Sequence, residues 1–134
     1  MSESDLAGMS PAEVNVIARG LYWLAATDGV EDGEVALIEE FLRETGSQWT
    51  LEQIQQTPFD PRELNAFLET SFMRHVFLKA AVALIAADGE VSHLERQALH
   101  RCARMLGLSD RQFQELAEQA QTIAKETEAS SATG

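Results

Sequence analysis

The sequence repeats one pattern, in which an apolar segment ends in Asp-Gly and an amphipathic segment follows after a short turn. The first apolar segment closes with LAATDG (24–29) and the second with LIAADG (84–89). Both segments are apolar nearly all round, and helices of that kind lie in the middle of a bundle, covered by their neighbours. The pattern predicts a compact all-α bundle with an internal helix-turn-helix duplication.

Helix start signals recur along the whole chain. A Ser, Thr or Asp is followed three positions later by Glu or Gln at Ser10, Thr50, Asp60, Ser92 and Ser109, which is the pattern of a capping box. No stretch alternates with the period of a strand. We therefore expect about seven helices, over residues 11–27, 32–45, 50–56, 61–72, 74–87, 92–106 and 109–126.

The chain has 134 residues, which suits one domain with a single core. We expect a flexible N-terminus over 1–10, one helical domain over 11–126 and a flexible tail over 127–134, because KETEASSATG is small and polar. The chain has no apolar run of about 18 residues, and MSESDLAG lacks the features of a secretory signal. We expect a cytoplasmic protein that does not insert directly into a membrane.

The net charge of −12 excludes sequence-independent nucleic-acid binding, which requires many Lys and Arg residues. The imbalance is concentrated in residues 1–67, which carry 13 acids against 3 bases. Its densest part runs from Asp28 to Glu44 and suits a cation or a protein partner with a basic surface. A solvated helix face is the competing interpretation. The charge pattern leaves the oligomeric state open.

Two alignments of the copies compete downstream of Asp-Gly. One pairs DGEVALIE (32–39) with DGEVSHLE (88–95) at five of eight positions and equates Glu39 with Glu95. The other pairs Asp28 with Asp88, deletes one residue and equates Glu34 with Glu95. We prefer the second, because it keeps the distance from the glutamate to the glycine that ends the next helix.

Side-chain direction supports this choice. At about 100° per residue, Glu34 falls inside the apolar arc of its helix, whereas Glu39 points outward. Glu95 falls near the centre of the arc of its own helix. The two arcs are formed by Val35, Leu37, Ile38, Phe41 and Leu42, and by Leu94, Ala98, Leu99, Cys102, Met105 and Leu106. A buried carboxylate is costly unless it is hydrogen-bonded, paired or bound to a metal, so Glu34 and Glu95 each require a partner.

The duplicated pattern resembles the TerB-like family of small bacterial helical domains, named for tellurite-resistance TerB and also found at the N-terminus of a membrane-anchored J-domain co-chaperone. The resemblance covers about residues 14–120, and AADGEVSHLE (86–95) followed by MLGLSD (105–110) carries it. The turn of the first copy, VEDGE, is one residue shorter and more acidic.

The resemblance implies a compact helical bundle whose acidic motif residues form a divalent-cation site. On this chain the implied ligands are Asp28 and Glu34 from one copy and Asp88 and Glu95 from the other. Oxygen ligands favour Ca²⁺, Mg²⁺ or Mn²⁺ over zinc. The resemblance further implies a non-catalytic module in a bacterial stress response of the tellurite-resistance type.

A purely structural role for these acids is the main alternative. Glu95 fits a capping box with Ser92, and such a chain would be an interaction scaffold without metal. The first copy has Glu31 in place of Ser92, so the same box does not simply apply there. An EF-hand over DGVEDGEVALIE (28–39) is weakened by Val30 and Ala36 at ligand positions.

The remaining reactive residues predict no enzyme. His93 and His100 are seven residues apart, too far for one helix to chelate an ion, and His75 has no acidic or cysteine neighbour at useful spacing. The single cysteine, Cys102, is expected to be a buried free thiol. Methionine and the aromatic residues at helical spacing are expected in the core. Trp49, Ile54 and Phe59 are expected to anchor the irregular stretch 46–61 to the core.

Overall fold

The computed structural model describes residues 10–27, 29–87 and 89–133, and these form seven α-helices and no strand. The helices are α1 (Pro11–Ala25), α2 (Asp32–Glu44), α3 (Leu51–Gln56), α4 (Arg62–Phe67), α5 (Ser71–Ile85), α6 (His93–Met105) and α7 (Asp110–Thr133). The predicted all-α class and the helix count are confirmed within this part of the chain.

Side-chain caps fix where most of the helices begin. Reciprocal capping boxes join Ser10 to Glu13 at α1 and Thr50 to Gln53 at α3. The Ser109 hydroxyl accepts the backbone N–H of Gln112, whose side chain accepts the N–H of Ser109 in return. Each box satisfies backbone donors that the first helical turn leaves unpaired.

Gly46 and Gly107 stop the equivalent helices α2 and α6. Their φ angles are 70° and 85°, in the left-handed region that glycine adopts without steric cost. The backbone N–H of Ser47 then donates to the Leu42 carbonyl, and the N–H of Leu108 to the Ala103 carbonyl. The two copies therefore end their second helices with the same Schellman-type turn.

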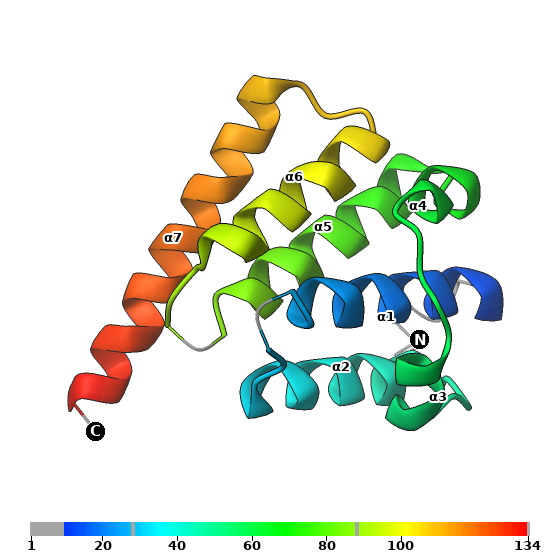
Figure 1. The fold of residues 1–134 in the computed structure, drawn as a ribbon, viewed down its shortest axis with the longest axis horizontal. Coiled ribbons are helices and arrows are strands. Elements are labelled where there is room, and N and C mark those ends of the chain that lie inside the picture. The colour runs from blue at the N-terminus through cyan, green and yellow to red at the C-terminus, as the bar shows by residue number, and fades with distance from the viewer. Residues whose placement is uncertain (1–9, 28, 88, 134) are drawn as a thin grey trace.

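The two central helices of the prediction, α1 and α5, pack directly against each other (Figure 1). Helix α1 also contacts α2, α3, α4 and α6, so it is covered on most sides. Helix α5 contacts α2, α6 and α7 in addition to α1. The largest fully buried side chains include Ile17, Leu21, Leu24, Phe77 and Leu84, which all come from these two helices.

Two polar groups tie the helices together inside this apolar frame. Arg19 of α1 is 8% exposed and pairs with Glu63 of α4. Arg74 of α5 donates to the carbonyls of Leu68 and Leu106, at 2.7 and 3.2 Å, and so binds the ends of α4 and α6. The sequence alone predicted a role for neither arginine.

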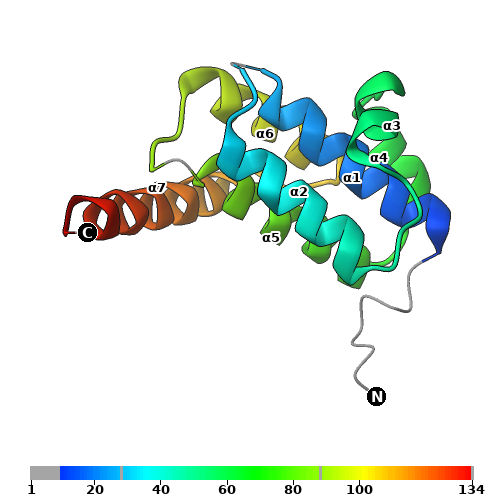
Figure 2. The same cartoon turned by 90° about the horizontal axis from the view of Figure 1, so that it is seen from below.

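Three predicted helix boundaries are wrong by more than two residues. Helix α4 ends at Phe67, not near residue 72, and α5 begins at Ser71, not at 74. The reason is a cap, because the Thr70 hydroxyl accepts the N–H of Met73 and starts α5 three residues early. Helix α7 continues to Thr133, past the predicted end near 126, and its last turns project beyond the other helices (Figure 2). The flexible N-terminus predicted for 1–10 lies almost wholly outside the described residues.

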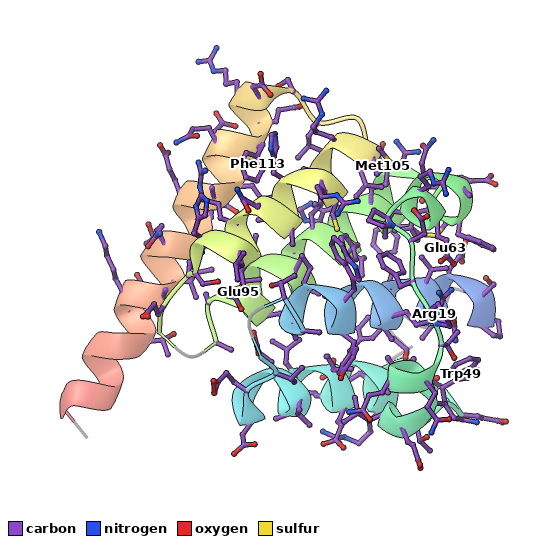
Figure 3. The ribbon with its side chains drawn as sticks, in the orientation of Figure 1. Arg19, Trp49, Glu63, Glu95, Met105 and Phe113 are labelled. Carbon is purple, nitrogen blue, oxygen red and sulfur yellow. The ribbon has the colours of Figure 1, made fainter. Side chains whose placement is uncertain are left out.

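Some predicted core residues lie at the surface. Ile54 is buried and Phe59 packs against the core, but Trp49 is 38% exposed and does not anchor its loop in the core. Leu94 and Met105 are 50% and 37% exposed, so they do not belong to the buried stripe of α6. In Figure 3, Met105 lies near the end of α6 and Trp49 lies beside α3, both toward the edge of the bundle.

Candidate functional site

Glu34 lies in the first turn of α2 and is 1% exposed, as its place in the apolar arc predicts. Its Oε1 accepts the backbone N–H of Glu31 at 2.8 Å. Glu39, the competing residue of the other alignment, is exposed. The burial of Glu34 therefore supports the alignment that equates it with Glu95.

Glu95 occupies the same position in the first turn of α6 and is 2% exposed. Its Oε1 accepts the N–H of Ser92 at 3.2 Å, and the Ser92 hydroxyl accepts the N–H of Glu95 at 3.0 Å. Figure 3 shows its side chain at the start of α6, between this helix and the rest of the bundle. The prediction that both carboxylates point inward is confirmed.

The first copy uses its glutamate as a cap more fully than the sequence suggested. With Glu31 in place of serine the same box did not simply apply, but the Glu34 carboxylate still accepts the N–H of the N-cap residue. This half of a capping box, in which the glutamate side chain accepts the N-cap N–H, requires only the backbone of the N-cap residue. One oxygen of each inward glutamate is therefore engaged by its own helix.

The starts of the second helices lie beside the ends of the first helices of the opposite copy. A Cβ built on Gly33, next to Glu34, would lie 3.7 Å from the Cβ of Ala87, just after α5. In Figures 1 and 2 the start of α6 lies beside the end of α1. Each inward glutamate therefore lies in a first turn that begins beside the end of the other copy's first helix.

The other two predicted ligands, Asp28 and Asp88, lie outside the described residues. Within the described part of the chain, no three His, Cys, Asp or Glu side chains are grouped so that they would hold a metal ion. The four-carboxylate site stays a prediction, of which the structure describes only the burial of Glu34 and Glu95.

The EF-hand alternative is wrong for this chain. Helix α2 begins at Asp32, which would be the fifth position of a calcium loop, and continues through Glu39 at the twelfth. A calcium loop wraps its ligands around the ion before the second helix is established. Here residues 32–39 are already helical, and Glu39 is exposed.

The acidic surface of α2 is confirmed as a solvent-exposed feature. We use this name for the exposed carboxylates of the turn and of α2, which are Glu31, Asp32, Glu39, Glu40 and Glu44. Their only basic neighbour on the helix is Arg43. The equivalent helix α6 carries three arginines, Arg96, Arg101 and Arg104, on its partly or fully exposed side. The duplicated helices therefore have opposite charge.

A groove between α2 and α5 was not identified from the sequence. It has a volume of about 570 Å³ and exposes part of Phe72, Leu37 and Val76. The sequence carried no signal for this groove, because an apolar residue on α5 can line an open groove or be covered by a neighbouring helix, and the sequence pattern is the same in both cases.

The remaining reactive residues are placed as expected. His75 and His93 are exposed, and the ring of His100 stacks on Phe113 at a centroid distance of 4.4 Å. Cys102 is a buried free thiol, and burial raises its pKa to about 12. Such a thiol is a poor nucleophile near neutral pH, because the thiolate is the reactive form.

The family model described as tellurite resistance protein TerB matches residues 13–119. Comparison with curated proteins and with solved structures gives no match. Among the described residues, no helix combines the length and the apolar character needed to cross a bilayer. The matched range includes both Asp-Gly turns and both inward glutamates.

Proposed function

Because this chain belongs to the TerB family, we propose that it is a non-catalytic binding module that holds a divalent cation and binds a protein partner in a bacterial stress response. The cation and the partner are separate parts of this proposal and have separate tests. The stress setting rests on the description of the family alone.

The reciprocal burial of Glu34 and Glu95 supports the cation site. Each carboxylate is almost fully withdrawn from water, at 1% and 2% exposure, and each lies at the start of a helix that begins beside the end of the other copy's first helix. Four carboxylates gathered at one site, as we propose for Glu34, Glu95, Asp28 and Asp88, are unfavourable without a compensating positive charge. A hard divalent cation with oxygen ligands supplies that charge.

The donor chemistry fits such an ion. A carboxylate has two oxygens and about four lone pairs, so the cap bond to Glu31 or Ser92 is compatible with ligation of a cation. All four proposed ligands are carboxylates, which suits Ca²⁺, Mg²⁺ or Mn²⁺.

Thermal denaturation with each ion tests the cation site. At an ion concentration of about 100 Kd, binding to the native state adds about 2.7 kcal/mol of stability, which a melting curve resolves. We expect this gain in the wild type and its loss in Glu34→Gln plus Glu95→Gln. The control is Glu39→Gln plus Glu40→Gln, which removes two exposed carboxylates of the same helix and keeps the gain. A wild-type melting temperature that none of the three ions raises would contradict the proposal.

The acidic surface of α2 supports a partner with a basic surface. Its exposed carboxylates outnumber the single arginine of the helix, and the whole chain has a net charge of −12. Such a field speeds the encounter with a basic protein. Charge reversal by Asp32→Lys plus Glu39→Lys should abolish co-purification of the partner from bacterial extract, whereas Glu115→Lys plus Glu118→Lys on α7 should not. Equal loss in both variants would contradict a role for this surface.

A scaffold without metal is the second candidate function. It is favoured by the finding that both inward glutamates act as helix caps. In that case Glu95→Gln is nearly silent, because the amide oxygen still accepts the Ser92 N–H, whereas Ser92→Ala costs about 1 kcal/mol. Urea denaturation in the presence of a chelator measures both values.

A further inference from the structure

The groove between α2 and α5 has an open apolar floor. We call it the α2–α5 groove and define its floor by Leu37, Phe41, Phe72 and Val76, with Ala80 and Ala83 behind them. Phe72 is 44% exposed, and Leu37 and Val76 are only partly buried. A floor of this kind offers apolar contact to the side chains of an amphipathic helix.

The two walls of the groove carry opposite charges. Glu40 and Glu44 project from α2 along one wall, and His75 and Lys79 project from α5 along the other. Within the described residues, neither Glu40 nor Glu44 forms a salt bridge with Lys79, so the groove is not closed by its own side chains. An occupant is therefore offered an apolar floor, an acidic wall and a basic wall.

The shape of the groove suits a helix. Helix α2 begins beside Ala87, at the end of α5, so the two helices run antiparallel and the groove follows them. Its α2 wall runs from Leu37 to Glu44, about 10 Å at 1.5 Å per residue, and its α5 wall runs from Phe72 to Ala83, about 16 Å. A helix laid between two others packs its ridges into such a groove.

We propose that the α2–α5 groove binds an amphipathic helix of a partner protein, whose apolar stripe is flanked by Lys or Arg on one edge and by Asp or Glu on the other. The basic edge lies against Glu40 and Glu44, and the acidic edge lies against Lys79. This proposal rests on the partner-binding part of the proposed function and identifies the surface and the chemistry of that partner.

Two designed helical peptides test the proposal, both with the same leucine stripe, composition and net charge. In the first, Lys occupies one edge and Glu the other; in the second, Lys and Glu alternate along both edges. Because a helix enters the groove in either direction, the first peptide always has one orientation that matches both walls. Fluorescence anisotropy should show that the wild type binds the first peptide about fivefold more tightly, which corresponds to about 1 kcal/mol.

Matched variants locate the binding. Phe72→Asp should weaken the binding of both peptides about tenfold or more, whereas Ile123→Asp, in the neighbouring groove between α5 and α7, should not. Lys79→Glu should abolish the preference for the first peptide, and Arg111→Glu, which makes the same charge change on exposed α7 surface, should preserve it. Circular dichroism verifies that each variant is folded.

Four outcomes would overturn the proposal. The first is an absence of peptide binding, and the second is binding with no difference between the two peptides. The third is a wild-type dimer in sedimentation that Phe72→Asp converts to a monomer, because a second copy would then occupy the groove. Binding that depends on Asp32 and Glu39 but not on Phe72 would also overturn it, and would leave the acidic-surface proposal standing.

Discussion

Arg19 of α1 and Glu63 of α4 form a bidentate ion pair, with nitrogen–oxygen distances of 2.7 and 3.1 Å. The same guanidinium donates to the Pro58 carbonyl at 2.8 Å and to Asn15 Oδ1 at 2.6 Å. Its plane also lies over the Phe59 ring, 5.8 Å from the centroid. The pair therefore fixes the irregular segment before α4 against the central helix (Figure 3).

Loss of this pair should destabilise the fold strongly. Glu63→Gln leaves the 8%-exposed Arg19 without a counter-charge, and breaking a buried pair from one side costs about 3 kcal/mol. Urea denaturation measures this loss of unfolding free energy. The control is Glu52→Gln on exposed α3, which should change the value little. Equal stability of the two variants would show that the pair contributes nothing.

The same pair should make stability depend on acidic pH. The hydrogen bond from Arg19 lowers the pKa of Glu63 from its ordinary value of 4.5. A carboxyl whose folded pKa is depressed contributes fully above the unfolded value, and its contribution disappears as the pH falls through the folded value. Unfolding free energy should therefore fall below pH 4.5 in the wild type, and Glu63→Gln should reduce that fall. Parallel pH profiles for the two proteins would refute this assignment.

Gly20 should tolerate no side chain. A Cβ there would lie 2.9 Å from Cε1 of the fully buried Phe77 and 3.2 Å from Cζ of Phe59. Gly20→Ala should therefore destabilise the protein by about 1 to 3 kcal/mol, although alanine favours the helix. Gly33→Ala in α2 is the matched control, because its Cβ meets Ala87 only at 3.7 Å. It should stabilise by about 0.5 to 1 kcal/mol, so melting curves of the two variants should shift in opposite directions.

Cys102 should be unreactive until the protein opens. Its side chain is fully buried, and its pKa is raised to about 12, chiefly by burial. A disulfide reagent at about pH 8 should label the thiol negligibly in the native protein and rapidly in urea, because the reagent requires an accessible thiolate. Rapid labelling without denaturant would mean that α6 separates from the core under native conditions.

The sequence was sufficient to predict the helices and the inward glutamates, because both depend on local patterns. Capping residues start helices through hydrogen bonds within one turn, and the 100° step places Glu34 and Glu95 among apolar neighbours. The same step placed Leu94 and Met105 in the core, and these residues are exposed. A helical arc shows which residues share a face, but not how far the next helix extends over it.

Long-range polar contacts were beyond reach for a different reason. Arg19 lies in an apolar segment, which indicates that it needs a partner, but nothing local identifies Glu63, 44 residues away, as that partner. The contact of Arg74 with the Leu106 carbonyl spans 32 residues in the same way. The α2–α5 groove depends on the distance between two helices of different copies. That distance cannot be read from the pattern of a single sequence.

The reciprocal arrangement of the helix starts and ends bears on how the molecule assembles. Helix α2 starts against the end of α5, and α6 starts beside the end of α1. Each half of the chain therefore supplies the wall, that is, the packing surface, against which the second helix of the other half begins. Neither half has that wall alone. Two fragments separated between α3 and α4 should therefore remain unstructured individually and regain helicity only by complementation on mixing.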